Sequence, residues 1–199
     1  MEKVLKVMSG DKKWYVLRAR YGQGKRACSC LQENGIDVYY PLYKTKKRED
    51  GKLKTIVRPL LPCFIFVHST IDDLNKIFVN TPLLYQLARY FRDKTKNDNV
   101  SGKNPPLVVG DKHMNNFQKV VSVAIGEGDK GAGLVRENNR VNYSYKIGDM
   151  VRVIGGPYIG VVGKVARING QQRIVVEIPG VCRYATQYIA TPLLEPYRK

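Results

Sequence analysis

The chain has 199 residues, of which 34 are Lys or Arg and 17 are Asp or Glu, so its formal net charge is +17. Hydrophobic residues make up 43% of the chain, which is typical of globular proteins and argues against global disorder. No apolar run approaches the roughly 20 residues that a membrane-spanning helix needs, and the N-terminus lacks the features of a signal peptide. We therefore expect a cytoplasmic protein with two small domains and no membrane partner.

The excess of positive charge, with a pI near 9.8, predicts a partner that carries phosphates, either nucleic acid or a machine that holds it. The usual metal ligands are few, and no cysteine forms a CxxC pair with a second pair at zinc spacing. The cysteines and histidines are Cys28, Cys30, Cys63, Cys182, His68 and His113. We expect these side chains to be structural, with neither a metal nor another cofactor.

The first elements expected in the chain are a strand, a helix and a second strand. Residues 14–19 combine aromatic and β-branched residues in a short run, which predicts a strand. After a glycine-rich break at 22–24, residues 25–34 predict a helix, and Gly35 falls where a left-handed C-terminal cap is favoured. Residues 36–40 alternate well enough to form a strand with one buried face.

A basic arm at residues 44–54 comes next. Asp50-Gly51 within it is a strong signal for a tight hairpin turn, because both central residues of such a turn must tolerate positive φ. The chain then returns into residues 63–67, Cys-Phe-Ile-Phe-Val. This apolar run predicts a central strand that is covered on both faces.

Residues 72–79 predict a short helix that Ser69 or Thr70 caps and that Thr81-Pro82 ends. Residues 83–89 predict a further strand. The order to this point is strand, helix, strand, strand, helix and strand. It predicts an α+β fold of the ferredoxin-like split-βαβ type.

The middle of the chain is expected to contain a loop, a helix and a linker. Residues 92–106 are polar and rich in turn formers. Residues 111–124 predict a helix whose inner side holds Met114, Phe117, Val120 and Val121. Residues 126–144 are rich in Gly, Asn and charge, which predicts a flexible linker after a first domain at 12–125.

The remainder, residues 145–199, is a different kind of sequence. Short strands expected at 150–154, 160–168 and 173–178 are separated by Gly-, Pro- and Asn-containing turns. Such frequent tight turns between short strands predict a small β-barrel.

Segment 146–165, KIGDMVRVIGGPYIGVVGKV, carries the most specific pattern in the chain. Gly148-Asp149 and Gly156-Pro157 mark turns, Gly163 allows close approach of strands, and Tyr158 is expected as an exposed aromatic on a loop. The pattern resembles a KOW motif, which implies an SH3-like barrel. KOW motifs occur in NusG-type factors and in some ribosomal proteins, and the pattern alone leaves both open.

The N-terminal half resembles the NusG N-terminal domain at three points in the right order. Trp14-Tyr15-Val16 is similar to that family's opening strand, 61–67 to its central strand, and Val79-Asn80-Thr81-Pro82 to its helix-ending motif. Cys63 departs from the family, which usually has Gly after the proline. The resemblance implies a bacterial transcription elongation factor, and the absence of any catalytic constellation agrees with a protein that is not an enzyme. The sequence leaves the oligomeric state open, and a monomer is the default expectation.

The resemblance also implies a partner surface. NusG N-terminal domains clamp onto the coiled helices of the RNA polymerase clamp through apolar residues, and the matching candidates are Trp14, Leu61 and Phe64. Aromatic strand residues such as Trp14 and Phe64 fit a protein core equally well. Leu61 stands beside two prolines at a strand entry, where we expect exposure.

Basic side chains are the candidates for contact with the DNA or RNA of the elongation complex. Alternatively, these basic side chains only cover a solvent-exposed helix face and hairpin and contact no nucleic acid. Without interleaved aromatics, the arm suits attraction to the phosphate backbone better than base reading. The candidates are Lys25, Arg26, Lys44, Lys46, Lys47, Arg48, Lys52 and Lys54.

Within the family, the chain is most similar to the UpxY-type antiterminators of polysaccharide operons, on Tyr40-Pro41-Leu42 and on 193–196, Leu-Leu-Glu-Pro. Tyr158 and Pro179 are candidate partner contacts on the KOW loops. Pro179 stands where general NusG proteins have a Phe that contacts termination factor Rho and a ribosomal protein, so binding of those two partners is doubtful. The alternative function is that of a ribosome-associated KOW-domain RNA-binding protein.

Overall fold

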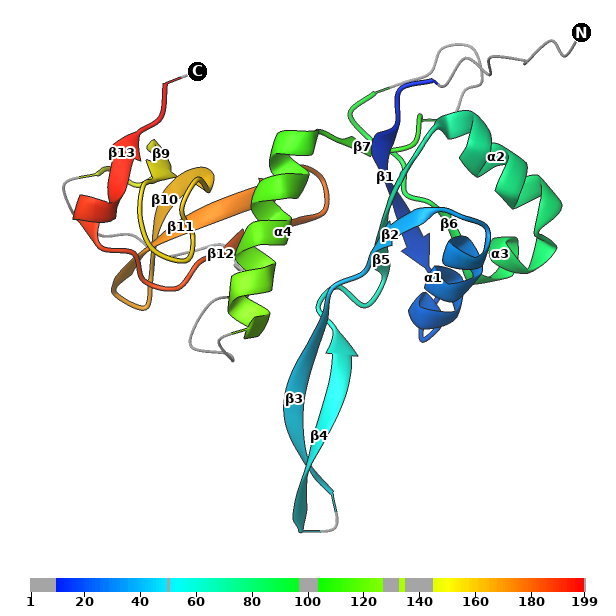
Figure 1. Cartoon of the computed structure of the whole chain (residues 1–199), viewed down its shortest axis with the longest axis horizontal. Helices are drawn as coiled ribbons and strands as arrows, with labels where there is room; N and C mark the ends of the chain where they lie inside the picture. The colour runs from blue at the N-terminus through cyan, green and yellow to red at the C-terminus, as the bar shows by residue number, and fades with distance from the viewer. Residues whose placement is uncertain (1–9, 50, 97–103, 127–132, 135–144, 199) are drawn as a thin grey trace, which may run out of the picture. The chain divides into compact units, whose positions relative to one another are not determined.

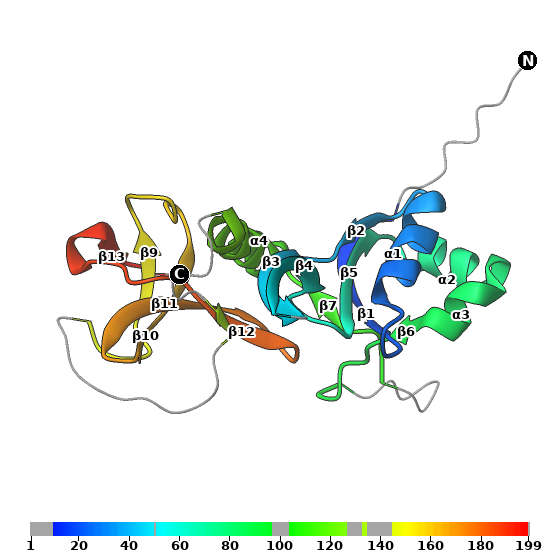
Figure 2. The same ribbon diagram turned by 90° about the horizontal axis from the view of Figure 1, so that it is seen from below.

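A computed structural model describes residues 10–49, 51–96, 104–126, 133–134 and 145–198. The chain divides into two compact units, namely Met1–Tyr43 with Val57–Gly110, and Lys44–Ile56 with Asp111–Lys199. Each unit combines helices with strands (Figures 1 and 2), which confirms the expected α+β class.

The first unit is built on an antiparallel sheet with the spatial order β2-β5-β1-β6, and a short strand, β7, also pairs with β1. β1 is the strand on which the others depend, because it pairs with β5, β6 and β7. The strands are β1 (Lys13–Ala19), β2 (Asp37–Tyr39), β5 (Phe64–Ser69), β6 (Ala88–Tyr90) and β7 (Val108–Val109). The strands expected at 14–19 and 63–67 are thus confirmed, and the one expected at 36–40 is shorter than expected.

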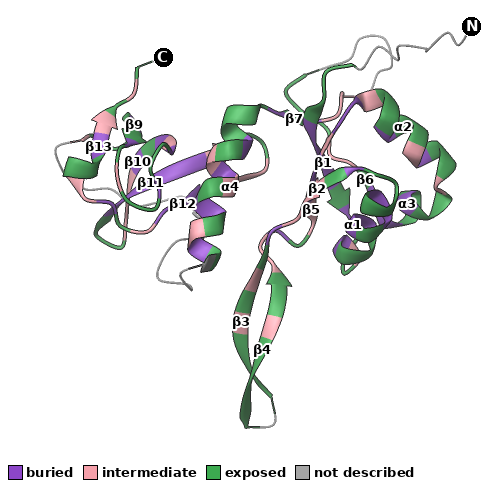
Figure 3. Ribbon diagram, in the orientation of Figure 1, coloured by how far each residue is buried: buried purple, intermediate pink, exposed green. Residues whose placement is uncertain are grey.

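Three helices lie on one face of this sheet (Figure 2). They are α1 (Gly24–Glu33), α2 (Ile71–Asn80) and α3 (Pro82–Leu87). Alternate residues of the two central strands point toward them, and Leu17 and Ile65 are fully buried in the resulting core. The helices contribute Leu31, Leu74 and Leu84, which are also fully buried. Figure 3 shows this burial along β1 and β5.

The helix boundaries follow from local chemistry. The Thr70 hydroxyl accepts a hydrogen bond from the backbone N–H of Asp73 at 3.1 Å, which caps α2 as expected. α1 ends at Glu33, and Gly35 has φ +75°, the left-handed conformation that its position after a helix favours.

The prediction of a strand at 83–89 is wrong for most of that segment. The chain forms α3 there, and a strand begins only at Ala88. Pro82 is suited to the first turn of a helix, where its missing N–H costs nothing. Leu84 and Leu87 are three residues apart and both buried, which is helical spacing that the apolar run concealed.

The basic arm is a hairpin of two eight-residue strands, β3 (Leu42–Glu49) and β4 (Lys52–Pro59). Within the described residues, these strands form a separate two-stranded sheet (Figure 1). Gly51 has φ +74°, as a tight turn requires, and Asp50 lies outside the described residues. Figure 3 shows that the hairpin is exposed along most of its length.

The C-terminal strands form a six-stranded sheet with the order β13-β9-β10-β11-β12-β8. In the part of the chain that the structure describes, this sheet is open, so the expected closed barrel is not observed. The strands are β8 (Gly133–Leu134), β9 (Met150–Val153), β10 (Val162–Ile168), β11 (Gln171–Ile178), β12 (Cys182–Ala185) and β13 (Leu194–Pro196). Of the linker expected at 126–144, Gly126 ends α4, and β8 pairs with β12. Residues 127–132 and 135–144 lie outside the described part of the chain.

The helix expected at 111–124 is confirmed as α4 (Asp111–Gly126), which lies against β11 and β12 (Figure 1). Its four expected inner residues are all buried. The Phe117 ring meets the Tyr184 ring edge-on, with centroids 6.0 Å apart. Asn116 accepts a hydrogen bond from the backbone N–H of Val162 at 3.1 Å, so polar contacts also join the helix to the sheet.

Gly163 lies where β10 crosses close to β11. A Cβ atom added there would lie 2.5 Å from the carbonyl oxygen of Val175 and 2.7 Å from the Ile174 side chain. No larger residue fits without movement of the backbone, which confirms that this glycine permits a close approach of strands.

We therefore expect Gly163→Ala to lower the free energy of unfolding by about 1–3 kcal/mol, the usual cost of overpacking. Gly155→Ala is the matched control in the same unit, because an added Cβ there meets a flexible end of Leu193, at 3.0 Å. Urea denaturation of both variants and the wild type measures the difference. Equal stability of the two variants would contradict this account of the strand crossing.

Candidate functional site

The sheet face opposite α1, α2 and α3 carries two of the three candidate polymerase-binding residues. Trp14 and Phe64 belong to the alternate set of β1 and β5 side chains, which also includes Val16 and Phe66. Val16 and Phe66 are fully buried, and Trp14 is 9% exposed with its ring stacked on His68 at 4.9 Å between centroids. Trp14 therefore behaves as a core residue of this unit.

Phe64 is the most accessible of the three candidates. It is half-buried, and its ring meets that of Phe91 edge-on at 5.1 Å between centroids. Leu61 is 6% exposed, so the exposure expected from its neighbouring prolines is wrong. The backbone N–H of Phe64 donates to the Leu61 carbonyl at 3.1 Å, because the chain turns tightly into β5 and draws Leu61 inward.

The structure brings Leu61 and Phe64 together but not Trp14. Phe64 pairs with Arg18 at one end of β1, whereas Trp14 pairs with His68 at the other. Arg18 lies four residues along β1 from Trp14, which is roughly 14 Å at about 3.4 Å per residue.

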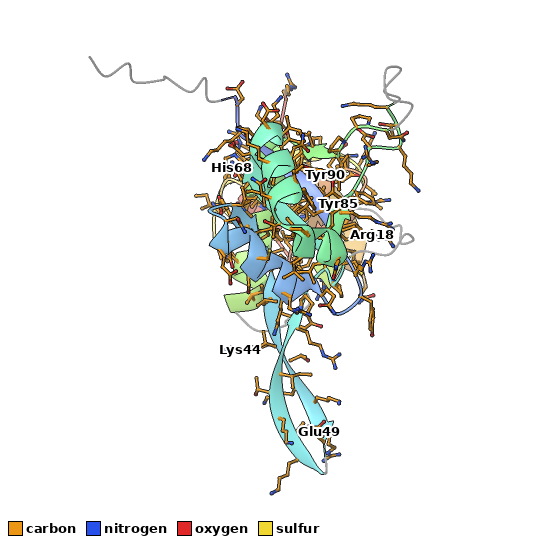
Figure 4. All side chains as sticks on the ribbon, turned by 90° about the vertical axis from the view of Figure 1, so that its right-hand side faces the viewer. Arg18, Lys44, Glu49, His68, Tyr85 and Tyr90 are labelled. Atoms are coloured by element: carbon orange, nitrogen blue, oxygen red, sulfur yellow. The ribbon has the colours of Figure 1, made fainter. Side chains whose placement is uncertain are left out.

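All the candidate nucleic-acid residues are exposed. Lys25 and Arg26 lie on the first turn of α1, and the other six lie on the hairpin. β3 and β4 with their turn hold seven basic and two acidic residues, so the hairpin is strongly positive. Figure 4 shows Lys44 near its base and Glu49 near its tip.

The two sides of the hairpin differ in charge pairing. Glu49 accepts from Lys47 at 3.5 Å and from Lys54 at 3.1 Å, which partly neutralises these amines. Side chains alternate along a strand, so Lys44 and Lys46 lie on the side of β3 away from Lys47 and Glu49. Neither of them takes part in an ion pair among the described residues.

The two candidate contacts on the KOW loops differ in exposure. Tyr158 is 4% exposed, so the exposed aromatic that we expected is wrong. Its hydroxyl accepts a hydrogen bond from the Gln187 N–H at 3.4 Å, because the loop folds the ring inward. Pro179 is exposed in a turn that the Val181 N–H closes on the Ile178 carbonyl at 3.0 Å.

Burial keeps the thiols of two cysteines protonated. Burial raises the pKa of Cys28 and the pKa of Cys182 to about 12 each, so both thiols stay protonated near neutral pH. Within the described ranges, no group of three or more His, Cys, Asp and Glu side chains could hold a metal ion. No described helix is long and apolar enough to cross a membrane.

One arrangement was not anticipated from the sequence. Arg18 of β1 lies directly opposite Arg89 of β6, and both side chains are exposed. The two residues are far apart in the chain, so no local spacing signals their proximity. Only the pairing of β1 with β6 reveals it.

Two segments of the chain match known protein families. Residues 12–118 match the family described as transcription termination factor nusG, and residues 147–177 match the KOW motif. No curated protein matches the chain.

Two solved structures are similar to the chain at low identity. One is described as "Domain interaction in Thermotoga maritima NusG", with 18% identity, TM-score 0.45, and coverage of 94% of this chain and 98% of that chain. The other is "Crystal Structure of MjSpt4:Spt5 complex conformation B", with 12% identity, TM-score 0.25, and coverage of 94% and 97%. Because the NusG match spans more than half of its residues, the chain belongs to the NusG family.

Proposed function

We propose that the chain is a non-enzymatic transcription elongation and antitermination factor. It binds RNA polymerase through its N-terminal domain and suppresses pausing or termination, on specific operons of the polysaccharide type. The observation that carries this function is the NusG match over 12–118 followed by a KOW motif at 147–177. The exposed basic hairpin supports contact with the nucleic acid of the elongation complex.

The proposed domain architecture is a ferredoxin-like domain at 12–125, a flexible linker at 126–144 and an SH3-like KOW domain at 145–199, although α4 (Asp111–Gly126) packs on β11 and β12 in this structure. The antiparallel order β2-β5-β1-β6, with helices on one face, supports the first part. The strand order β13-β9-β10-β11-β12 of the C-terminal sheet supports the KOW domain. The protein is proposed to act as a cytoplasmic monomer.

Phe64 is the residue of choice for testing the polymerase contact. Trp14 and Leu61 remain proposed members of the same surface, but both are buried, and a polar substitution at either would disturb the core. Phe64 is half-buried and combines an apolar ring with partial access to solvent. Such partly exposed aromatics are common anchors of protein interfaces.

We expect Phe64→Glu to weaken binding to bacterial core RNA polymerase at least tenfold, because it places a charge in an apolar contact. A pull-down at near-physiological salt measures the loss. Tyr21→Glu is the control, since Tyr21 is an aromatic of the same unit that is 95% exposed. Failure of the wild type to bind polymerase, with retention on ribosomes instead, would favour the alternative of a ribosome-associated KOW-domain RNA-binding protein.

The hairpin is the proposed contact for nucleic-acid phosphates, together with Lys25 and Arg26 of α1. Its amines are exposed and lack aromatic neighbours for base stacking, so binding is expected to be electrostatic and independent of sequence. Lys44 and Lys46 are not engaged by Glu49 and should contribute more than Lys47 and Lys54.

We expect Lys44→Gln with Lys46→Gln to weaken binding to a single-stranded DNA oligonucleotide. The slope of log affinity against log salt should become shallower by about 1.4, because two phosphate contacts of about 0.7 each are lost. Fluorescence anisotropy at several salt concentrations gives both quantities. Lys47→Gln with Lys54→Gln removes the same charge and should cost less, and equal losses in the two variants would exclude a side-specific contact.

The specialised role of the protein rests on the KOW domain. Pro179 fits the second position of a turn in which Gly180 has φ +76°, and it offers no aromatic ring to a partner. General NusG proteins have Phe at this point. We therefore propose that binding to Rho is weak, which leaves the protein free to act against termination.

Pro179→Phe is expected to strengthen binding of the full chain to Rho, because it restores an exposed aromatic anchor. Pro179→Ala is the control for loss of the proline alone. Affinities measured by biolayer interferometry give the comparison. Tight binding of Rho by the unmodified chain would contradict the specialised role.

A further inference from the structure

Three side chains form a row across the sheet of the first unit. Phe64 of β5 pairs with Arg18 of β1, and Arg18 pairs with Arg89 of β6. Residues directly opposite each other on neighbouring strands point to the same face, with Cβ atoms about 5 Å apart. The two guanidinium groups therefore belong to one site, on the face opposite α1, α2 and α3.

The arginine pair lacks compensation from the described part of the chain. Like charges directly opposite each other destabilise a sheet. Both side chains are exposed, and neither forms an ion pair or a side-chain hydrogen bond among the described residues. The pair thus costs stability, and an anionic partner would remove that cost.

The backbone pairing of the strands places the two arginines beside apolar rings. Phe64 meets Phe91 edge-on, and the Phe91 N–H donates to the Val16 carbonyl at 2.9 Å. The Leu107 N–H donates in turn to the Phe91 carbonyl at 2.8 Å. Exposed arginines at the border of half-buried aromatic rings combine the polar rim and apolar centre of a protein interface.

The rings favour a protein over a nucleic acid as the occupant. A base needs an open aromatic face on which to stack. Phe64 is half-buried and packed edge-to-face with Phe91, so only part of its ring is open to a stacking base. A guanidinium can also hold a carboxylate through two parallel hydrogen bonds.

We propose that Arg18 and Arg89 together bind the carboxylates of an acidic segment on the protein partner, next to the apolar contact of Phe64. The inference rests on the proposed function, under which that partner is RNA polymerase. The arginine pair would add ionic contacts to the apolar contact proposed for Phe64. It also explains why two exposed arginines face each other without an acidic neighbour among the described residues.

Arg18→Glu separates binding from stability. The variant places Glu opposite Arg89 and turns a repulsive pair into an attractive one, so the melting temperature should stay the same or rise. Affinity for core RNA polymerase should nevertheless fall at least tenfold, because a carboxylate now meets the partner's carboxylates. Arg89→Glu should behave in the same way.

Lys76→Glu is the matched control, with the same change of net charge on α2, where the Lys76 side chain is 71% exposed. It should keep wild-type affinity for polymerase. Unchanged polymerase binding by Arg18→Glu and Arg89→Glu would overturn the inference and leave the proposed function standing. Failure of the wild type itself to bind polymerase would instead refute the proposed function, and the inference with it.

A parallel titration with a single-stranded DNA oligonucleotide distinguishes carboxylates from phosphates. The proposal requires Arg18→Glu to bind this DNA as well as Lys76→Glu does. A specific loss of DNA affinity in Arg18→Glu, with polymerase binding retained, would make the pair a phosphate site and overturn the proposal.

Discussion

The antiparallel pairing of β1 with β5 is the constraint on which the N-terminal unit depends. Six pairs of residues align along it, from Lys13 with Ser69 to Arg18 with Phe64. One set of alternate side chains forms the core with the helices, while the other set forms the opposite face. A slip of one residue would exchange the two faces, so the same register that buries Leu17 also places Arg18 beside Phe64.

The basic residues lie outside this core because the core cannot bury unpaired charges. Lysine and arginine are not buried without partners, and a sheet between layers has little room for them. All seven basic side chains from Lys44 to Arg58 are therefore carried by a separate hairpin, where they are exposed to solvent. There the cost of like charges is small because water and salt screen them, and the positive field remains available to a phosphate backbone.

The C-terminal sheet shows how close packing restricts which residues can serve partners. Gly163 brings β10 against β11, and the loop between β9 and β10 turns Tyr158 inward onto the Gln187 backbone. An aromatic on a glycine-rich loop is thus used for the core of this small unit. Pro179 stays exposed in the three-residue turn between β11 and β12.

Local patterns in the sequence determined the elements whose causes are themselves local, such as the cap at Thr70, the turn at Gly51 and the apolar run of β5. The segment at 83–89 was misassigned because its short apolar run suits both a helix and a strand, and packing against the core decides between them. Burial at Leu61 and Tyr158, and the meeting of Arg18 with Arg89, were decided only by the tertiary structure. These features depend on which distant segments lie alongside each other, and contacts between distant segments leave no periodic trace in a single sequence.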